Sequence, residues 1–442
     1  MKKFEKATAA LALLAGIASA HGAEGVEFSG YLRGGGNASN LGGGSACFRL
    51  PGYGSGTGTG TGTGAAGFRL GNECDFYLSN KIGVPFGSEG GTDFRGVYEF
   101  SVAPQGLQKD EQSVFTNKSL YVEAIDIGAG SGVDMLSGVN VWVGKRQPKL
   151  QDVHILDLWY VGASGIGLGL DNVYTPVGTF SYALLRNVEG DVNWMGGIGT
   201  DNPTIDSTAG GIATVNHQFT LDGIPTNPGG NVMLNLDVVR KNNRDFVLAS
   251  KNGVAFTAQH EQKSPFSLGG SNRLALQYAR DAAGLDGQAL TGFTDSMKSW
   301  RVLDVLTIEP KGVPLSASFV GLYQHTTLND TPGSQYAVGM RPIYHFNRLM
   351  SLAVEVGQIG IKSGDGPTRR LNKLTIAPQL SKGTGFWARP TLRVYYTYAK
   401  WNDAAAASGS VACTARDCST ALPVYNDMRS GSSIGAQVEA WW

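Results

Sequence analysis

The chain has 442 residues with 36 basic and 36 acidic side chains, so its formal net charge is zero. This balance gives no indication of a nucleic-acid partner, which would favour a basic face. Glycine accounts for 63 residues, about twice its usual share, and aromatic residues for 10%. Together with many short runs of alternating polarity, this composition favours an all-β chain.

The N-terminal sequence MKKFEKATAALALLAGIASA has the features of a secretory signal peptide. Lysines precede a short apolar run, and the small-residue motif ASA follows it. We therefore expect residues 1–20 to be removed, with cleavage after Ala23 as the alternative, and residues 21–442 to form one exported domain. Cleavage after Ala20 leaves 33 basic and 35 acidic side chains, a net charge of −2. Beyond this segment no run of 18 or more apolar residues occurs, so we expect no transmembrane helix.

The exported chain contains four cysteines, which are Cys47, Cys74, Cys413 and Cys418. Four cysteines allow three pairings, and an exported protein tolerates disulfides. The simplest scheme joins each cysteine to its neighbour in sequence and closes two local loops. The first pair encloses the low-complexity stretch GSGTGTGTGTG. We therefore expect a stapled surface loop over residues 40–68 and a second long surface loop over residues 402–428.

Several segments alternate between apolar and polar residues, as strands with two different faces do. In the stretch SIGAQVEAWW, one face holds Ile434, Ala436, Val438, Ala440 and Trp442, and the other holds Gln437, Glu439 and Trp441. The stretches VEFSGYLRG and NVMLNLDVV alternate in the same way. The polar faces mix charges with large aromatic residues, which is typical of a wet lumen.

This pattern favours a barrel in the outer membrane of a Gram-negative cell over a soluble sandwich. A membrane-spanning strand needs roughly 9–11 residues, and a closed barrel has no exposed edge. At about 23 residues per strand and connection, the mature chain makes roughly 18 strands, and counting alone leaves 16 open. We therefore predict an all-β transmembrane antiparallel β-barrel with an aqueous passage.

The stretch QDVHILDLWY brings together Asp152, His154 and Asp157. These are metal-ligand types, but their spacing converges on one point only in a special loop, so we expect no metal. A catalytic role needs a recognisable nucleophile motif, and the chain has none. We therefore expect no catalytic residue and no cofactor, and an outer-membrane hydrolase is the least favoured interpretation.

Motifs from Val26 to Trp442 resemble the maltoporin family of sugar-specific outer-membrane porins. They are FRLGNEC, VWVGKR with DVHILDLWY, FTAQHEQ, VGMRPIYHF, WARPTLRVYYTYAKW and GAQVEAWW. The resemblance implies an 18-stranded barrel that assembles as a homotrimer in outer-membrane lipid. It also implies that a loop at about residues 147–162 folds inward and constricts the lumen.

The resemblance further implies a row of lumenal aromatic residues along which sugar rings slide, flanked by a track of charged residues. The row corresponds to Tyr31, Tyr77, Phe256, Trp387 and Trp441. The track corresponds to Arg33, Arg69, Lys118 and Arg146, with Leu150, Asp152, His154, Asp157 and Trp159 at the constriction. Aromatic faces suit the C–H faces of a pyranose, and ionised groups bind its hydroxyl rim.

The sequence departs from the family pattern at several of these positions. Trp159 stands where the family has tyrosine, Leu150 and Lys118 where it has arginine, and Ser79 where it has glutamate. Gln108 lies near the place of a tryptophan that the family donates across the trimer. These departures bear on the sugar preference more than on the fold.

We therefore expect a porin for facilitated diffusion of maltose and maltodextrins. The alternatives are a porin for another oligosaccharide, such as a sucrose-like disaccharide, and a general diffusion porin. The long external loops also make a phage-receptor role conceivable.

Overall fold

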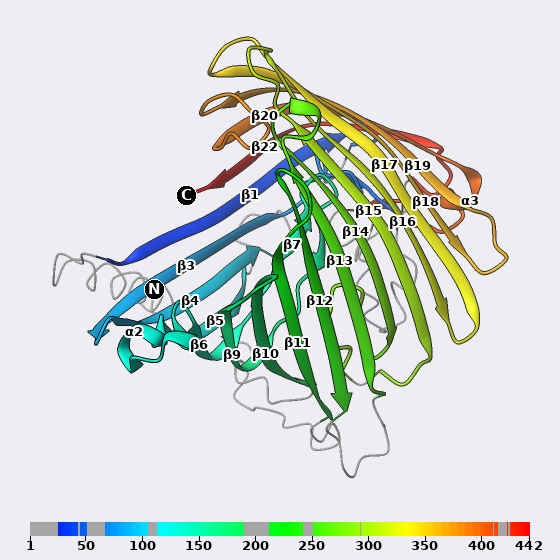
Figure 1. The fold of residues 1–442 in the computed structure, drawn as a ribbon. Helices are drawn as coiled ribbons and strands as arrows, with labels where there is room; N and C mark the ends of the chain where they lie inside the picture. Colours follow the sequence, from blue (N-terminus) through cyan, green and yellow to red (C-terminus); the bar gives the residue numbers. More distant parts are fainter. Residues whose placement is uncertain are drawn as a thin grey trace, which may run out of the picture.

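The computed structural model describes residues 25–42, 45–50, 67–104, 113–189, 212–241, 251–291, 293–409, 411–413, 422 and 425–442. The proposed signal peptide, the Gly–Thr stretch, Gln108 and Cys418 lie outside these residues. The described part forms an 18-stranded antiparallel sheet, shown in Figure 1. Its last strand pairs with its first, which pairs in turn with the next strand of the sheet, so the barrel is closed. The predicted antiparallel barrel of about 18 strands is confirmed.

The barrel strands follow the chain in order. They are β1 (Glu27–Ser39), β3 (Phe76–Glu89), β4 (Thr92–Pro104), β5 (Ser113–Ile125), β6 (Asn140–Arg146), β9 (Gly165–Thr175), β10 (Gly178–Glu189), β11 (Ile212–Pro225), β12 (Gly230–Lys241), β13 (Gly253–Lys263), β14 (Ser271–Asp281), β15 (Met297–Ile308), β16 (Leu315–Leu328), β17 (Thr331–His345), β18 (Met350–Ser363), β19 (Arg369–Ser381), β20 (Thr391–Trp401) and β22 (Ser430–Trp441). Outside the barrel sheet, β2 (Cys47–Phe48) pairs with β21 (Ala412–Cys413), and β7 (Gln151–Val153) pairs with β8 (Leu158–Val161).

Each barrel strand separates its side chains into an inward and an outward face. In β20, the inward residues are buried, and Arg393 among them contacts Glu439 on the neighbouring strand. The residues between them, such as Val394 and Tyr396, are exposed on the outside of the wall. This alternation gives the barrel an apolar outer band for lipid and a polar lining.

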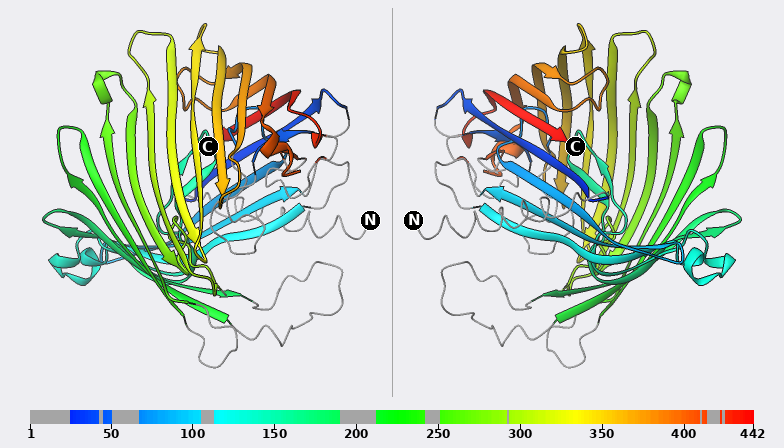
Figure 2. Two further views of the ribbon diagram at one scale, coloured as in Figure 1. Left: turned by 90° about the vertical axis from the view of Figure 1, so that its right-hand side faces the viewer. Right: turned by 90° about the vertical axis from the view of Figure 1, so that its left-hand side faces the viewer.

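The two ends of the barrel differ in the length of their connections. At the end where β1 begins and β22 finishes, many connections are short, such as residues 90–91 and 176–177. The longest of them holds the helix α2 (Ile127–Ser131) and the 3-10 turn η1 (Asp134–Leu136). The opposite end carries the long connections, which face the outside of the cell in barrels of this kind. Figure 2 shows the tilted strands of the wall from two sides.

Two further short helical segments occur in the connections. The 3-10 turn η2 (Pro265–Ser267) joins β13 to β14, and the helix α3 (Asp403–Ala406) follows β20. Across the described ranges, no helix is long and apolar enough to cross a membrane.

The segment after the first long connection, residues 67–74, folds into the lumen. The backbone N–H of Leu70 donates to Glu355 Oε1 at 3.0 Å, and Lys373 Nζ lies 2.9 Å from the same carboxylate oxygen. The Phe68 ring packs directly against Gly357. A Cβ atom at position 357 would lie 2.0 Å from a ring carbon of Phe68. Part of the barrel interior on the β17–β19 side is therefore filled by the protein's own chain.

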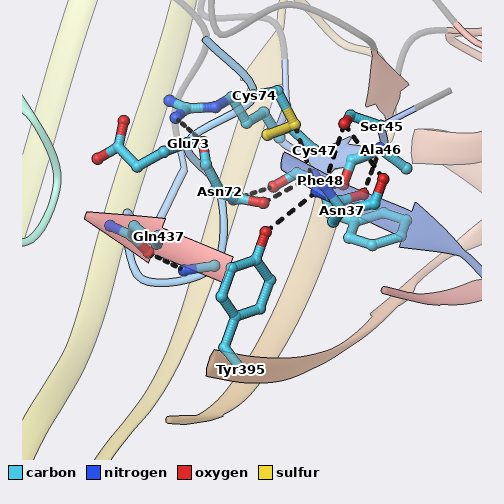
Figure 3. The surroundings of a disulfide bond; sticks show 12 residues. Asn37, Ser45, Ala46, Cys47, Phe48, Asn72, Glu73, Cys74, Tyr395 and Gln437 are labelled. Atoms are coloured by element: carbon cyan, nitrogen blue, oxygen red, sulfur yellow. Dashed lines mark hydrogen bonds between the residues drawn. A yellow bond between two sulfur atoms is a disulfide. The ribbon is translucent and has the colours of Figure 1, made fainter. Parts of the chain in front are cut away.

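A disulfide between Cys47 and Cys74 ties this segment to β2, as predicted. Figure 3 shows Asn37 beside it, where its side chain donates to the carbonyl of Ala46 and to the hydroxyl of Tyr395, each at 3.2 Å. The predicted Cys413–Cys418 pair involves a residue outside the described part of the chain.

Substitutions on the outward face of β14 test where the bilayer lies along the barrel wall. Leu276, at the middle of β14, points outward and is 52% exposed, and its register partners Ala258 and Val302 share that face. Leu276→Arg should lower the free energy of unfolding from lipid by about 2–4 kcal/mol, because the charge would sit near the bilayer midplane. Asn272→Arg, on the same face at the strand end, should cost about 0–1 kcal/mol. Equal costs in denaturant titrations would contradict this placement.

Candidate functional site

A β-hairpin crosses the lumen. It is formed by β7 and β8 within the connection from β6 to β9, and Figure 1 shows it inside the barrel. On one side it is bonded to the wall at β13 and β14. Arg273 donates to Gln151 Oε1 and to the carbonyl of Asp152, both at 3.1 Å. The hydroxyl of Tyr160 donates to Gln259 Oε1 at 2.5 Å.

The turn of the hairpin is bonded to the opposite side of the barrel. Arg33 Nη1, from β1, lies 2.7 Å from Asp157 Oδ2. The backbone N–H of Arg69 donates to the carbonyl of Ile155 at 3.0 Å, and its guanidinium contacts His154 Nδ1 at 3.1 Å. The hairpin is therefore fixed at both ends, and residues 67–74 form part of its support.

A buried carboxylate, that of Glu439 on β22, connects these supports. Five polar groups lie within 3.5 Å of it: Tyr31 Oη at 3.1 Å, Arg69 Nη2 at 2.8 Å, Arg389 Nη2 at 2.5 Å, Arg393 Nη1 at 3.4 Å and His154 Nε2 at 3.5 Å. Glu439 itself is 1% exposed. Buried charges persist only when paired and hydrogen-bonded in this way.

Both ring nitrogens of His154 face charged groups. Arg69 Nη1 lies 3.1 Å from Nδ1, while Arg389 Nη2 and Glu439 Oε1 lie 3.2 Å and 3.5 Å from Nε2. Burial lowers the pKa of His154 to about 3; the charge of Glu439 opposes this shift, and that of Arg69 adds to it. The hairpin therefore carries a neutral histidine at neutral pH.

Burial changes the role expected for part of the charged track. Arg33 and Arg69 are 3% exposed and His154 is 8% exposed. Their polar atoms are directed at carboxylates and at the hairpin, so they are not available to the rim of a passing solute. The prediction of direct solute contact is corrected for these three residues, which instead hold the hairpin and the aromatic rings in place.

Four of the five predicted aromatic residues form a row along the lumen. The ring centroids of Tyr77 and Tyr31 are 6.1 Å apart, and those of Trp441 and Trp387 are 6.4 Å apart. Tyr31 and Trp441 are register partners on adjacent strands, which joins the two pairs. Trp387 lies in the connection from β19 to β20, and its ring centroid is 5.2 Å from that of His154.

Buried cations support this aromatic row from behind. The guanidinium carbon of Arg33 lies 5.3 Å from the Tyr77 centroid. That of Arg69 lies 5.7 Å from Tyr31. That of Arg389 lies 4.4 Å from Trp441. Cation–π contacts of this kind fix ring positions when desolvated.

Phe256 does not belong to the row. Its neighbour Thr257 accepts from Gln277, whose side chain also donates to the Tyr160 carbonyl inside the barrel. Alternation therefore turns Phe256 outward, together with its register partner Tyr278. The sequence-based assignment of Phe256 to the lumenal row is wrong.

Lys118, on β5, lies between two aromatic rings that face the lumen. Its Nζ lies 5.3 Å from the Trp159 centroid and 5.6 Å from that of Tyr77. It is also 3.4 Å from Glu99 Oε1. Trp159 and Leu150 are 43% and 46% exposed, so the hairpin presents apolar surface next to this ammonium.

Another pair of charged groups remains partly exposed on the inner wall, on β6 and β9. Arg146 Nη1 lies 2.9 Å from Asp171 Oδ2, and its guanidinium stacks over Tyr121 and Trp142. The side chains of Arg146 and Asp171 are 18% and 17% exposed. These groups, with Lys118 and Glu99, can bind hydroxyl groups from solution.

Glu439, Arg389 and Glu99 were not predicted as site residues. Glu439 lies two residues before Trp441 on the same face, so alternation placed it in the lumen without revealing its partners. Glu99 accepts from Ser79 at 3.1 Å and so supplies a carboxylate at the place where the family glutamate is missing. Among the residues that the structure describes, no group of three His, Cys, Asp or Glu side chains is arranged to hold a metal ion.

A closed barrel with an apolar outer band, a polar interior and a hairpin crossing its lumen defines an outer-membrane porin. A family model described as LamB porin matches residues 26–442, and the chain belongs to this family of outer-membrane porins.

Solved structures of outer-membrane proteins are similar over most of the chain at low identity. OccAB1 of Acinetobacter baumannii is 11% identical, with 95% of this chain and 97% of that chain covered and a TM-score of 0.47. OprD of Pseudomonas aeruginosa is 8% identical, with 95% of each chain covered and a TM-score of 0.44. The outer-membrane protein OmpT of Vibrio cholerae, in a trimer form, is 10% identical, with 94% and 99% covered and a TM-score of 0.35.

The position of Glu439 predicts its effect on the hairpin. Glu439→Gln should leave several buried cations without their anion, at a cost of about 3–5 kcal/mol. The hairpin should then move more, so single-channel recordings should show more open-channel noise and a higher mean conductance. The matched control is Glu27→Gln, because the Glu27 side chain is 69% exposed. Recordings that do not differ between the two variants would contradict an anchoring role.

Because His154 is buried and neutral, we expect docking of the hairpin against residues 67–74 and β22 to depend on pH. The docked histidine has a pKa of about 3, and an undocked one about 6.5. Above about pH 6.5 both forms are neutral and docking is constant. Below it the undocked form binds a proton that the docked form does not, so docking weakens progressively towards about pH 3.

Open-channel noise recorded between neutral and acidic pH measures this effect. His154→Gln keeps an acceptor for Arg69 without titrating, and it should flatten the rise in noise on acidification. The same rise in the variant would assign the effect to other groups.

Proposed function

We propose that this porin mediates facilitated diffusion of oligosaccharides, with maltodextrins as the preferred class. The carrying observation is the row formed by Tyr77, Tyr31, Trp441 and Trp387, fixed from behind by buried arginines. Flat apolar rings in series offer repeated weak sites for pyranose faces, which is what rapid passage requires. Family membership supports a channel, and no energy source or cofactor is needed.

The exposed charged groups would bind the sugar rim while the rings bind its faces. Lys118 with Glu99 lies next to the row, and Arg146 with Asp171 lies farther along the inner wall, on β6 and β9; both pairs keep part of their surface open. Hydrogen bonds between these groups and the sugar hydroxyls would replace the bonds that the hydroxyls make to water. Ionised groups make the stronger hydrogen bonds of this kind. The hairpin is the proposed constriction, and Leu150 and Trp159 make its edge more apolar than the family pattern.

That apolar edge favours a second candidate, a porin for another oligosaccharide such as a sucrose-like disaccharide. Leu150 removes a guanidinium from the constriction, and Trp159 has one N–H donor and a larger face than tyrosine. We also propose a homotrimer in outer-membrane lipid, which is the assembly that the family resemblance implies.

Two tryptophan substitutions test the aromatic row. Trp387→Ala and Trp441→Ala should each weaken the block of ion current by maltohexaose about threefold to tenfold, because a stacking surface is lost. Ion conductance should stay equal or rise. Trp442→Ala is the matched control, since Trp442 contacts Phe28 on the outer face.

The same recordings in planar bilayers distinguish the candidate functions. Block that is unchanged in both lumenal variants would show that the row is misassigned. Block by sucrose alone would favour the second candidate. A conductance indifferent to every sugar would identify a general diffusion porin and contradict the proposal.

A further inference from the structure

A polar cavity lies under the base of the hairpin, along strands β9 to β13. Its volume is about 440 Å³, which is within the range of small-molecule sites. Its lining includes Lys149, Asp171, Ser181, Thr220, Asp222 and Glu261. Strands β3, β4, β5 and β6 separate β9 from β1, which carries Tyr31 and pairs with β22. The cavity is therefore separate from the aromatic row.

The polar side chains of the cavity belong to the inward face of the wall. Thr220 donates to Asn235 at 2.8 Å, and Ser181 is the register partner of Thr220. The aromatic lining residue, Tyr182, pairs instead with Phe219 on the outer face, at 5.1 Å between centroids. Within the described lining, no aromatic ring faces the cavity, so it offers no stacking surface for a sugar face.

The charges in and next to the cavity balance, because Glu261 and Lys263 of its lining add one charge of each sign to two ion pairs. Lys149 forms an ion pair with Asp222, and Arg146 pairs with Asp171. Lys149 and Asp222 nevertheless keep 27% and 38% of their side-chain surface open. A paired carboxylate retains lone pairs for further donors. Such a cavity suits neutral hydroxyl groups better than a free ion, because its cationic and anionic groups are equal in number.

We propose that this cavity is a second sugar subsite, which binds the hydroxyl rim of a neutral oligosaccharide without stacking on its rings. The inference rests on the proposed function and extends it. The two walls of the passage then divide recognition, with ring faces bound along β1, β3 and β22 and rims bound along β9 to β13. A sugar could thus be held below the hairpin while another occupies the aromatic row.

Protection of an introduced thiol tests occupancy of the cavity directly. Ser181→Cys places a thiol in the cavity, and Thr220→Cys provides a second position if the first variant folds poorly. The rate of modification by a neutral, water-soluble maleimide is measured on the full-length protein with and without maltotriose. Sugar at twice its dissociation constant should slow the reaction about threefold, because one site in three then remains free.

Two controls separate binding from simple occlusion. Lys311→Cys places an exposed thiol in the turn between β15 and β16, away from both the cavity and the aromatic row. Polyethylene glycol of the same mass as maltotriose replaces the sugar in a parallel reaction. We expect protection at position 181 by maltotriose that exceeds both the protection at position 311 and the protection by the polymer.

The outcomes distinguish this inference from the proposed function. An unchanged rate at position 181 while maltotriose blocks current through the same variant would overturn the cavity and leave the porin proposal standing. Equal slowing at both positions, or by sugar and polymer alike, would also overturn the cavity. Absence of both block and protection would overturn the proposed function together with the inference.

Discussion

The arrangement of the lumen depends on a carboxylate that solvent does not reach. Glu439 collects the hydroxyl of Tyr31, the guanidinium of Arg69 and the guanidinium of Arg389 around one pair of oxygens. These partners come from the first strand, the first inward-folded segment and the connection that carries Trp387. One buried anion therefore sets the relative positions of the hairpin and the aromatic row. Without it, the buried Arg389 and Arg393 would lose their carboxylate partner, which is strongly unfavourable.

Burial divides the charged residues of the lumen into two groups with different tasks. The first group, which includes Arg33 and Arg69, stands behind the rings and satisfies carboxylates and the hairpin. The second group, which includes Lys118 and Arg146, keeps open surface beside the passage. In our proposal only the second group meets the solute. Rigid rings and exposed ion pairs together provide weak sites that differ in chemistry along one path.

The sequence predicts well which face of a strand each side chain belongs to, because successive side chains of a strand point to opposite faces. This logic placed Tyr31, Trp441 and Glu439 in the lumen. For Phe256 the family motif and the alternation disagree. The motif implies a lumenal ring, whereas the polar residues Thr257 and Gln259 indicate that Phe256 points outward. The local disulfide between Cys47 and Cys74 was also predictable from spacing and export.

Contacts between distant segments were not predictable in this way. The partners of Glu439 lie between 46 and 408 residues away, so nothing in its local sequence indicates that it is buried. Glu99 replaces the carboxylate missing at Ser79 only because the register of β3 and β4 brings the two side chains within 3.1 Å. The separation of Arg33 and Arg69 from the solute likewise follows from packing, since exposed and buried lumenal arginines look alike in a sequence.

The most direct test of the account is an experimental structure of the protein with maltohexaose bound. We predict density for consecutive sugar rings over Tyr77, Tyr31, Trp441 and Trp387, with Lys118 and Arg146 at the hydroxyl rim. Arg33, Arg69 and His154 should remain behind the rings, bonded to Glu439, Asp157 and the hairpin. Sugar bound directly to these buried residues, or a lumen without ordered sugar at saturating concentration, would contradict it.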